Sequence, residues 1–366
     1  MEERWRAAIS GERPGCLTHA LRAAKWPYLA GLKTNLAIYD IGLKARTKPA
    51  LPTVSVGNLT LGGTGKTTTT RSLARELLAR GVRPGIVLRG HRRKDETGPL
   101  LVADTETLLT SVDEAGDEAT MLAGTIPGCP VAVGKRREEV IRLLADTGAQ
   151  VALLDDGYQY FRMERAVNIA LLDATVELSR ARVFPAGYLR EPLTHLRRAT
   201  HVLLTHADLA PRAHVEAMAE LARKYAPEAL VMCARHRPTG LYPLTDPAAE
   251  LPVERLAGKS VLAVSAVGNP ASFEGALLEI GARIVGSVVF DDHHDYRPED
   301  YRTMRGAMRI EKPDFIVVTE KDAVKLPPPP EDMSPVLALK VDLEIIEGAD
   351  AWEAMLVEIE NGWPEE

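Results

Sequence analysis

The sequence predicts an α/β protein in which a doubly wound, largely parallel sheet is joined to a second, smaller α/β domain and preceded by an amphipathic helix. Three observations support this fold class. Short apolar runs without polar alternation, which are typical of buried parallel strands, alternate with helical stretches. A glycine-rich loop joins the first of these runs to a helix within residues 53–80. A second series of apolar runs begins near residue 261.

Size and composition restrict the class of protein. The 366 residues are 45% hydrophobic and 26% charged, as expected for one large or two ordinary globular domains. Cys16, Cys129 and Cys233 are far apart, so we expect no zinc site, no disulfide framework and a reducing compartment. The first 48 residues hold nine Lys/Arg and four Asp/Glu, which leaves a net charge of −11 on the remainder and argues against a nucleic-acid partner.

Residues 17–46 predict one amphipathic helix, with Pro27 in a first helical turn. Its apolar stripe recurs at steps of three and four and consists of Tyr28, Leu32, Leu36, Tyr39 and Leu43. The stripe either packs on the main domain or, with the surrounding basic residues, lies on an anionic membrane surface. No apolar run reaches the roughly 18 residues of a membrane span, and we expect no signal peptide. The protein is therefore expected in the cytoplasm or on the cytoplasmic face of a membrane.

The remaining elements follow in two series. The first has expected strands at 53–56, 85–88, 151–154, 168–172 and 201–205, and a helix at 67–80 that ends before Gly81. The second has expected strands at 261–267, 284–290 and 315–319, with helices at 271–278 and 299–308. Residues 235–243, with two prolines and a glycine, are expected to form a connection. The expected division is 1–48 helical segment, 49–236 first domain, 237–345 smaller domain with linker strands, and 346–366 C-terminal helix.

A glycine-rich loop between the first strand and its helix carries the strongest chemical signal. Glycines let backbone N–H groups turn toward phosphate oxygens, and the N-terminus of the following helix adds positive potential. Lys66 is expected to reach the β- and γ-phosphates and Thr67 to ligate Mg²⁺. The first domain is thus predicted to be of P-loop NTPase type. The predicted nucleotide-binding residues are Thr60, Leu61, Gly62, Gly63, Thr64, Gly65, Lys66 and Thr67; Thr60 stands where the usual pattern has glycine.

Two carboxylates, Asp155 and Asp156, directly follow the apolar strand at 151–154. Carboxylates at the end of a strand beside a P-loop hold Mg²⁺ directly or through water, and a turn or helix cap is the alternative. Asp117, in an acidic loop at 113–118, could accept a proton from an attacking hydroxyl. His293 and His294 could supply an imidazole for acid–base work or orientation, or could be structural.

Several motifs follow one another in the order of a known family. They are 56–60, 62–67, 88–90, 116–118, 155–159, 185–192, 268–270, 292–294 and 319–322. Together they resemble the lipid A 4'-kinase (tetraacyldisaccharide 4'-kinase) family from about residue 20 to about residue 326, and that family also has threonine at the position of Thr60. The resemblance implies a membrane-associated kinase with two α/β/α domains joined by a two-stranded linker. It would transfer the γ-phosphate of ATP to the 4'-hydroxyl of a tetraacylated glucosamine disaccharide 1-phosphate, forming lipid IVA.

The resemblance also implies residue roles. Asp117 becomes the candidate base, with His293 as its dyad partner. The magnesium-side candidates are Thr67, Asp155, Asp156 and Glu191. The candidates for phosphate or sugar contact are Asn58, Arg89, Gln159, Arg190 and His294. The basic N-terminal helix becomes a membrane-docking element, and no obligate protein partner is expected.

Three positions depart from the family pattern: His91 in the motif after Arg89, Ala119 after the Asp-Glu pair, and Tyr160 where the family has histidine. Two other classes of P-loop protein compete with the kinase. A regulatory or metallochaperone GTPase needs an Asn-Lys-x-Asp motif after a strand, and 319–322 lacks it because its lysine is one place late. A ligase related to dethiobiotin synthetase would act on a small soluble acceptor and would need no membrane helix.

Overall fold

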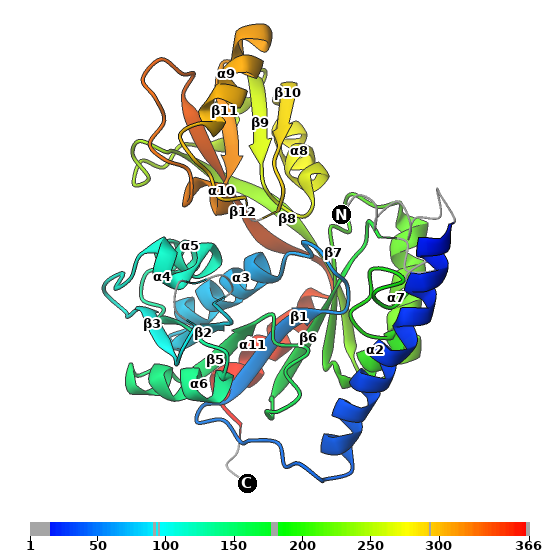
Figure 1. The fold of residues 1–366 in the computed structure, drawn as a ribbon. Coiled ribbons are helices and arrows are strands. Elements are labelled where there is room, and N and C mark those ends of the chain that lie inside the picture. The colour runs from blue at the N-terminus through cyan, green and yellow to red at the C-terminus, as the bar shows by residue number, and fades with distance from the viewer. Residues whose placement is uncertain (1–14, 91–92, 94–95, 177–181, 293, 364–366) are drawn as a thin grey trace.

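The computed structural model describes residues 15–90, 93, 96–176, 182–292 and 294–363. Its strands form one sheet in the order β10-β9-β11-β12-β8-β7-β6-β1-β5-β2-β4-β3. Figure 1 shows a larger and a smaller lobe at the two ends of this sheet, joined by the long strands β8 and β12. The strands are β1 (Thr53–Asn58), β2 (Pro84–Leu88), β3 (Leu100–Ala103), β4 (Val131–Val133), β5 (Val151–Asp155), β6 (Val167–Asp173), β7 (His201–Thr205), β8 (Leu230–Pro243), β9 (Ser260–Ser265), β10 (Arg283–Val289), β11 (Phe315–Thr319) and β12 (Val336–Glu347).

Helices cover both faces of the sheet in each lobe. The α-helices are α2 (Cys16–Asp40), α3 (Lys66–Ala79), α4 (Val112–Ala115), α5 (Asp117–Thr125), α6 (Arg137–Asp146), α7 (Arg212–Tyr225), α8 (Pro270–Glu279), α9 (Asp300–Glu311), α10 (Glu320–Ala323) and α11 (Ala349–Asn361). Successive strand side chains point to opposite faces. Leu153 of β5 accordingly packs in the cluster with α3 and α11, and the next residue, Leu154, packs in the cluster with α6. This confirms the predicted doubly wound arrangement.

The smaller lobe repeats that arrangement around β9, which lies between β10 and β11. Val261 and Ala263 face α8, whereas Leu262 and Val264 face α9. The eight predicted strands are confirmed within two residues at each end. β3 and β4 were not predicted, because runs of four and three residues are too short to show a periodic pattern.

Residues 235–243 connect the two lobes, as expected, and they do so as a strand. They are the last nine residues of β8, which pairs antiparallel with β12. The register shifts between Lys340 and Val341, where Pro238 and Gly240 lie opposite. A bulge at this point leaves Thr239 as the extra residue and accommodates a proline that would otherwise interrupt the ladder. The two segments that connect the lobes, β8 and β12, are therefore paired strands.

Two details of the predicted N-terminal helix were wrong. α2 begins at Cys16, so Pro27 lies in its interior on the exposed side and not in its first turn. It ends at Asp40, where Gly42 follows with φ +76°, as is usual after a helix C-terminus. Leu36 is buried, whereas Leu43 lies beyond the helix and is 74% exposed. The apolar stripe therefore packs, in part, on the larger lobe.

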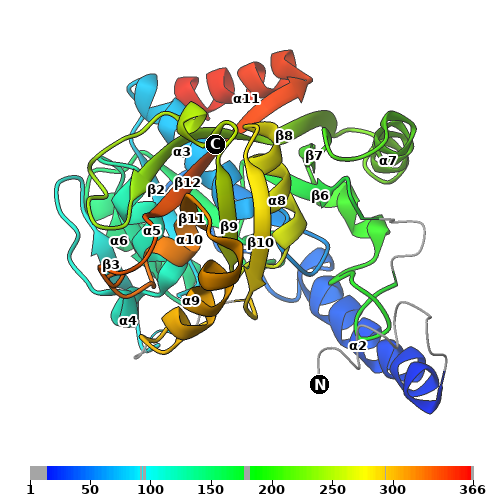
Figure 2. The same cartoon turned by 90° about the horizontal axis from the view of Figure 1, so that it is seen from above.

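The C-terminal helix α11 packs on the larger lobe. Trp352, Met355 and Leu356 join the cluster that contains Val54 of β1 and Leu73 of α3. Seen from above, α11 and α2 lie at opposite edges of the molecule (Figure 2). Among the helices that the structure describes, none combines the length and apolar character that crossing a membrane requires.

Candidate active site

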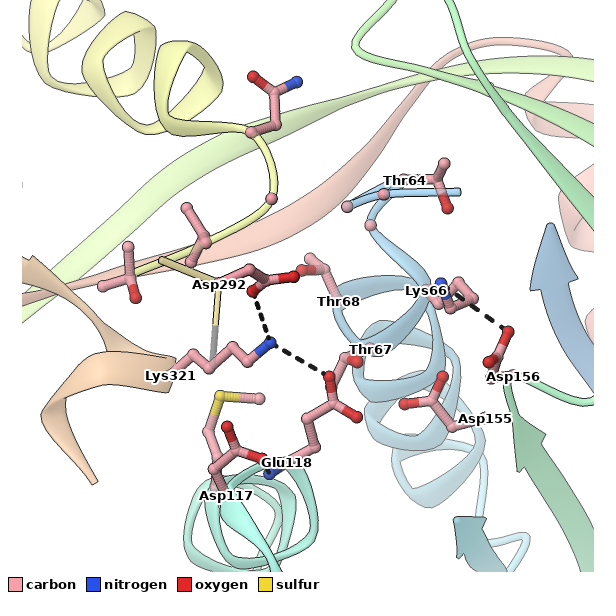
Figure 3. Close-up of a pocket in the computed structure, with 18 of the residues that line it drawn as sticks. Thr64, Lys66, Thr67, Thr68, Asp117, Glu118, Asp155, Asp156, Asp292 and Lys321 are labelled. Carbon is pink, nitrogen blue, oxygen red and sulfur yellow. Dashed lines mark hydrogen bonds and ion pairs between the residues drawn. The ribbon is translucent and has the colours of Figure 1, made fainter. Parts of the chain in front are cut away.

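A cavity of about 740 Å³ lies between the two lobes. Parallel strands place the residues that follow them at one edge of a sheet, and ligand sites form there. The larger lobe contributes the glycine-rich loop after β1, the carboxylates after β5 and the start of α5. The smaller lobe contributes loops after β9, β10 and β11. Figure 3 shows these side chains converging from both lobes.

The glycine-rich loop is held from several sides. Gly65 is the N-cap of α3 and adopts φ +79°, a conformation that favours glycine. Behind the loop, the amide of Asn58 donates to the Thr64 hydroxyl at 2.7 Å, and Thr205 Oγ1 donates to the Thr64 carbonyl at 3.1 Å. The ammonium of Lys66 lies 3.8 Å from Asp156 Oδ1, on the cavity side. The loop thus has the geometry of a phosphate cradle, with a lysine at its end.

A histidine pair that the sequence analysis missed supports the same loop. His236 of β8 is so close to Gly65 that a Cβ added there would lie 2.4 Å from its Nε2. His236 Nδ1 is 3.0 Å from Nε2 of His206, whose other ring nitrogen lies 3.1 Å from Asp173 Oδ2. Burial lowers the pKa of His236 to about 3, so its ring is neutral. No motif signals these residues, because they come from three different strands or strand ends.

The two carboxylates after β5 differ in environment. Burial raises the pKa of Asp155 to about 7. Neither of its oxygens accepts a hydrogen bond of normal geometry from the described residues, although the Thr67 hydroxyl lies near enough to favour the charged form. For Asp156, burial acts to raise the pKa, but Lys66 and Arg190 outweigh it and hold the pKa below its usual value. A buried carboxylate that lacks partners beside a phosphate cradle fits a divalent cation.

Magnesium would need further ligands at this site. The described residues contain no cluster of three or more His, Cys, Asp or Glu side chains that could hold a metal. Mg²⁺ is usually bound by one or two carboxylates together with substrate phosphates and water, so a sparse protein contribution is the expected pattern. Asp155 and Thr67 therefore fit the predicted role, with Asp156 beside them.

Asp117 and Glu118 were expected to lie in a loop, but they begin α5 after Gly116. Ser111 caps the preceding α4 through a capping box with Glu114, which explains why this acidic stretch is helical. Asp117 Oδ2 lies 3.6 Å from the ammonium of Lys325. Glu118 Oε1 lies 3.4 Å from that of Lys321. Both lysines come from the smaller lobe and were not predicted as site residues.

The other predicted residues are divided between the cavity and its surroundings. Arg89, Gln159 and Arg190 line it, and Arg190 donates to Asp156 at 2.9 Å. Asn58 is buried behind the loop, where its carbonyl accepts from Gln159. His293 lies outside the described residues.

Four predicted residues are not on the cavity wall, namely Asn58, Thr60, Glu191 and His294. Glu191 is completely buried, and its Oε2 is bound by His195 at 2.7 Å and Arg198 at 2.8 Å. Burial acts to raise the pKa of Glu191, but these two partners outweigh it and keep the side chain ionised. His294 stacks on Phe290 and bonds Asp300 at 2.9 Å. The structure therefore gives Glu191 and His294 partners of their own, and neither side chain is among those that line the cavity.

Known proteins are similar to this chain in sequence and in fold. A family model described as tetraacyldisaccharide-1-P 4'-kinase matches residues 17–360. The tetraacyldisaccharide 4'-kinase of Anaeromyxobacter dehalogenans is 35% identical over 356 residues, which cover 94% of this chain and 92% of the relative. That of Geobacter sulfurreducens is 35% identical over 350 residues, covering 94% and 96%. The chain belongs to the tetraacyldisaccharide 4'-kinase family.

A solved structure agrees with this assignment. The crystal structure of LpxK from Aquifex aeolicus in complex with ATP is 28% identical, with a TM-score of 0.73 over 93% of this chain and 98% of that one. Membership of the tetraacyldisaccharide 4'-kinase family confirms the predicted fold class, the kinase activity and the use of ATP. It does not favour the regulatory GTPase or the ligase.

One departure from the family pattern has a structural account. Tyr160 is the position at which the resemblance led us to expect histidine. Its hydroxyl donates to Glu138, and the backbone N–H of Arg137 donates to it at 3.3 Å. Tyr160 is not among the residues that line the cavity. Tyr160 therefore contacts the start of α6 and does not form part of the cavity wall. His91 lies outside the described residues.

Proposed function

We propose that this protein transfers the γ-phosphate of ATP to the 4'-hydroxyl of a tetraacylated glucosamine disaccharide 1-phosphate, forming lipid IVA in lipid A biosynthesis. The observation that carries the proposal is the cavity between the lobes. A phosphate cradle, Leu61–Thr67, and the carboxylate of Asp117 both line this cavity, and Asp117 forms an ion pair with Lys325 of the smaller lobe. Kinases need this combination, because the donor phosphates and the acceptor hydroxyl must meet with a proton acceptor nearby.

In this mechanism Asp117 accepts the proton of the 4'-hydroxyl as its oxygen forms a bond to the γ-phosphorus. The bond from that phosphorus to the bridging oxygen of ADP breaks, and Lys66 and the backbone N–H groups of the loop stabilise the charge on the phosphates. Mg²⁺, when bound at Asp155 and Thr67, would neutralise the β- and γ-phosphate oxygens. Arg190, Arg89 and Gln159 line the same cavity and would orient the acceptor. His293 would assist Asp117 as its dyad partner.

The proposed function also assigns a role to each part of the chain. We assign residues 49–236 to the P-loop kinase domain and 237–345 to the smaller domain with the linker strands. Residues 1–48 form the docking segment and 346–366 contain the C-terminal helix. The packing of α11 on β1 and α3 makes that helix part of the kinase domain in space.

Phosphate transfer to the lipid tests the proposal directly. Purified protein would be incubated with labelled ATP and the tetraacylated disaccharide 1-phosphate in detergent. We expect acceptor-dependent formation of a doubly phosphorylated lipid. ATP consumption that is unchanged by the acceptor, or a preference for GTP, would contradict it.

The substrate is a lipid, and α2 supplies a surface for reaching it. Trp26 is 65% exposed and Ile41 is 68% exposed, with basic residues nearby, and Lys25 lies 5.0 Å above the Trp26 ring. Tyr28 of the same helix packs edge-on against Phe184 at 5.6 Å and donates to the Arg190 carbonyl at 2.7 Å. The helix thus joins an exposed apolar and basic surface to the cavity wall, which supports peripheral docking on the cytoplasmic face of the inner membrane.

Vesicle flotation tests the docking surface. We expect Trp26→Ser to weaken binding to vesicles that contain phosphatidylglycerol, with activity in detergent retained. Ile310→Ser is the matched control, because Ile310 is 78% exposed on α9 of the smaller lobe. Equal loss of binding in both variants, or no loss in either, would remove α2 from the docking proposal.

A further inference from the structure

The short helix α10 and the residue pair after it carry two lysines to the junction between the lobes. The Thr319 hydroxyl caps this helix by accepting from the Asp322 backbone at 3.2 Å. Lys321 and Lys325 are four residues apart, so both ammonium groups point to the same side, toward the start of α5. Each lysine meets one member of the acidic pair Asp117 and Glu118. The ion pairs Lys321–Glu118 and Lys325–Asp117 therefore join α10 and the residue pair after it in the smaller lobe to the first turn of α5 in the larger lobe.

Lys321 bridges the two lobes along the cavity wall. Its ammonium lies 3.4 Å from Glu118 and 3.5 Å from Asp292, which follows β10 (Figure 3). Burial acts to lower the pKa of Lys321, but the carboxylates of Glu118, Asp292 and Asp117 outweigh it, so the pKa is raised and the lysine is charged. Lys321 therefore neutralises acidic groups from both lobes.

Lys325 has a more specific environment. Its side chain is 9% exposed, and its ammonium lies 3.6 Å from Asp117 Oδ2 and 4.0 Å from Asp322. It donates to the backbone carbonyl of His294 at 3.0 Å and lies 5.5 Å above the Tyr296 ring. One buried cation thus touches the candidate base of the larger lobe and the backbone next to residue 293 of the smaller lobe.

We propose that Lys325 is a positioning residue for phosphate transfer, which holds the Asp117 carboxylate against the segment that carries residues 293 and 294. The inference rests on the proposed function, in which Asp117 is the base. An ammonium at this distance favours the ionised carboxylate, and its bond to the His294 carbonyl brings the two halves of the site together. Lys325 itself is not among the residues that line the cavity, so it acts through Asp117.

The test compares Lys325→Met and Lys325→Arg with a control, Lys259→Met. Lys259 is an exposed lysine of the smaller lobe. We expect Lys325→Met to lower kcat roughly 10- to 100-fold, since small misplacements of reacting groups have effects of this size, while KM for ATP changes less than about twofold. Lys325→Arg should recover much of the rate, and Lys259→Met should match the parent protein. Thermal unfolding would show that each variant is folded.

The pH profile adds a readout that a structural role alone would not change. Among the described residues, the charged groups near Asp117 include Lys325, Lys321, Glu118 and Asp292. Removing the Lys325 ammonium takes a charge that favours the ionised Asp117 carboxylate away from it, so the acidic limb of kcat should move to higher pH in Lys325→Met and stay in place in the control. In an Asp117→Asn background, Lys325→Met should cause no further loss.

The outcomes separate the inference from the proposed function. If Asp117→Asn abolishes transfer but Lys325→Met leaves kcat and its acidic limb unchanged, the inference fails and the kinase mechanism stands. An additive loss in the double variant also overturns it. If Asp117→Asn is fully active, the assignment of the base fails first. If Lys325→Met does not fold, kcat and its acidic limb would be compared between Lys325→Arg and the parent protein. The double variant would likewise be compared with Asp117→Asn alone.

Discussion

The two walls of the cavity both consist of residues that follow parallel strands, but one wall is a continuous loop and the other is a set of side chains from separate loops. Both use residues at the carboxyl ends of parallel strands. The wall of the larger lobe is dominated by one continuous segment, the glycine-rich loop Leu61–Thr67. The wall of the smaller lobe is assembled from three separate loops, and its contribution is side-chain charge from Lys321 and Asp292.

This difference predicts different consequences of mutation. A backbone cradle binds the nucleotide in every state of the reaction, so damage to it should affect binding and catalysis together. Side chains that meet across the lobes are assembled from distant parts of the chain. Damage to them should lower kcat with little effect on KM for ATP. The predictions below test this comparison, in order of expected effect.

The largest effect is expected for Lys66→Ala. This change removes the cation nearest the phosphate cradle and leaves Asp156 with Arg190 as its remaining cationic contact. We expect phosphate transfer to fall at least roughly 10³-fold, because a preorganised charge at the transferring group is lost. Initial rates with labelled ATP would measure it, with thermal unfolding as the control for folding. A fully active variant would overturn the P-loop assignment.

Asp117→Ala should come next, with kcat lower by roughly 10²–10⁴-fold, the usual contribution of a positioned base. KM for ATP should stay close to that of the parent, because Asp117 begins α5 and lies outside the cradle segment. Steady-state kinetics at varied ATP would separate the two parameters. A rise in KM with constant kcat would show that the acidic pair serves nucleotide binding instead.

Arg71→Met tests whether the two lobes are joined by buried charge. Arg71 of α3 and Glu320 of α10 form an ion pair at 2.6 Å, and their side chains are 3% and 5% exposed. Removing the arginine leaves the buried Glu320 carboxylate without the cation with which it pairs among the described residues, which costs about 3–5 kcal/mol. Chemical denaturation would measure this loss. Arg71→Met combined with Glu320→Met should be closer to the parent, and an equally large loss in the double variant would contradict the account.

The smallest effect concerns pH and magnesium. Because the pKa of Asp155 is raised to about 7, this carboxyl holds a proton below that pH when no metal is bound. A metal ion must displace the proton, so the affinity for Mg²⁺ should be constant well above pH 7. It should weaken about tenfold per pH unit below it. Binding of a fluorescent ATP analogue at varied Mg²⁺ from pH 6 to 8 would measure this. Asp155→Asn is the control, and the pH dependence assigned to this group should be absent from it.

Local patterns were sufficient for much of the architecture. Strands buried on both faces are continuous apolar runs, so β1, β5, β6 and β7 could be located to within two residues. The cradle could be found because its function depends on neighbouring residues with one backbone geometry. Residues 235–243 were not predicted to form a strand because a proline in a strand is tolerated only at an edge or a bulge, and the bulge opposite Lys340 and Val341 depends on pairing with β12.

What the sequence by itself determined is the doubly wound fold, the glycine-rich loop that follows β1 and the two carboxylates that follow β5, since each shows as a pattern in neighbouring residues. Only the tertiary structure decided that Lys325 meets Asp117, that His236 packs against Gly65 and that Glu191 is bound by His195 and Arg198. Charges and rings from distant strands are brought together by the packing of the sheet and lobes. No periodicity or local motif records such a pairing, because its energy depends on distance in space and not on separation along the chain.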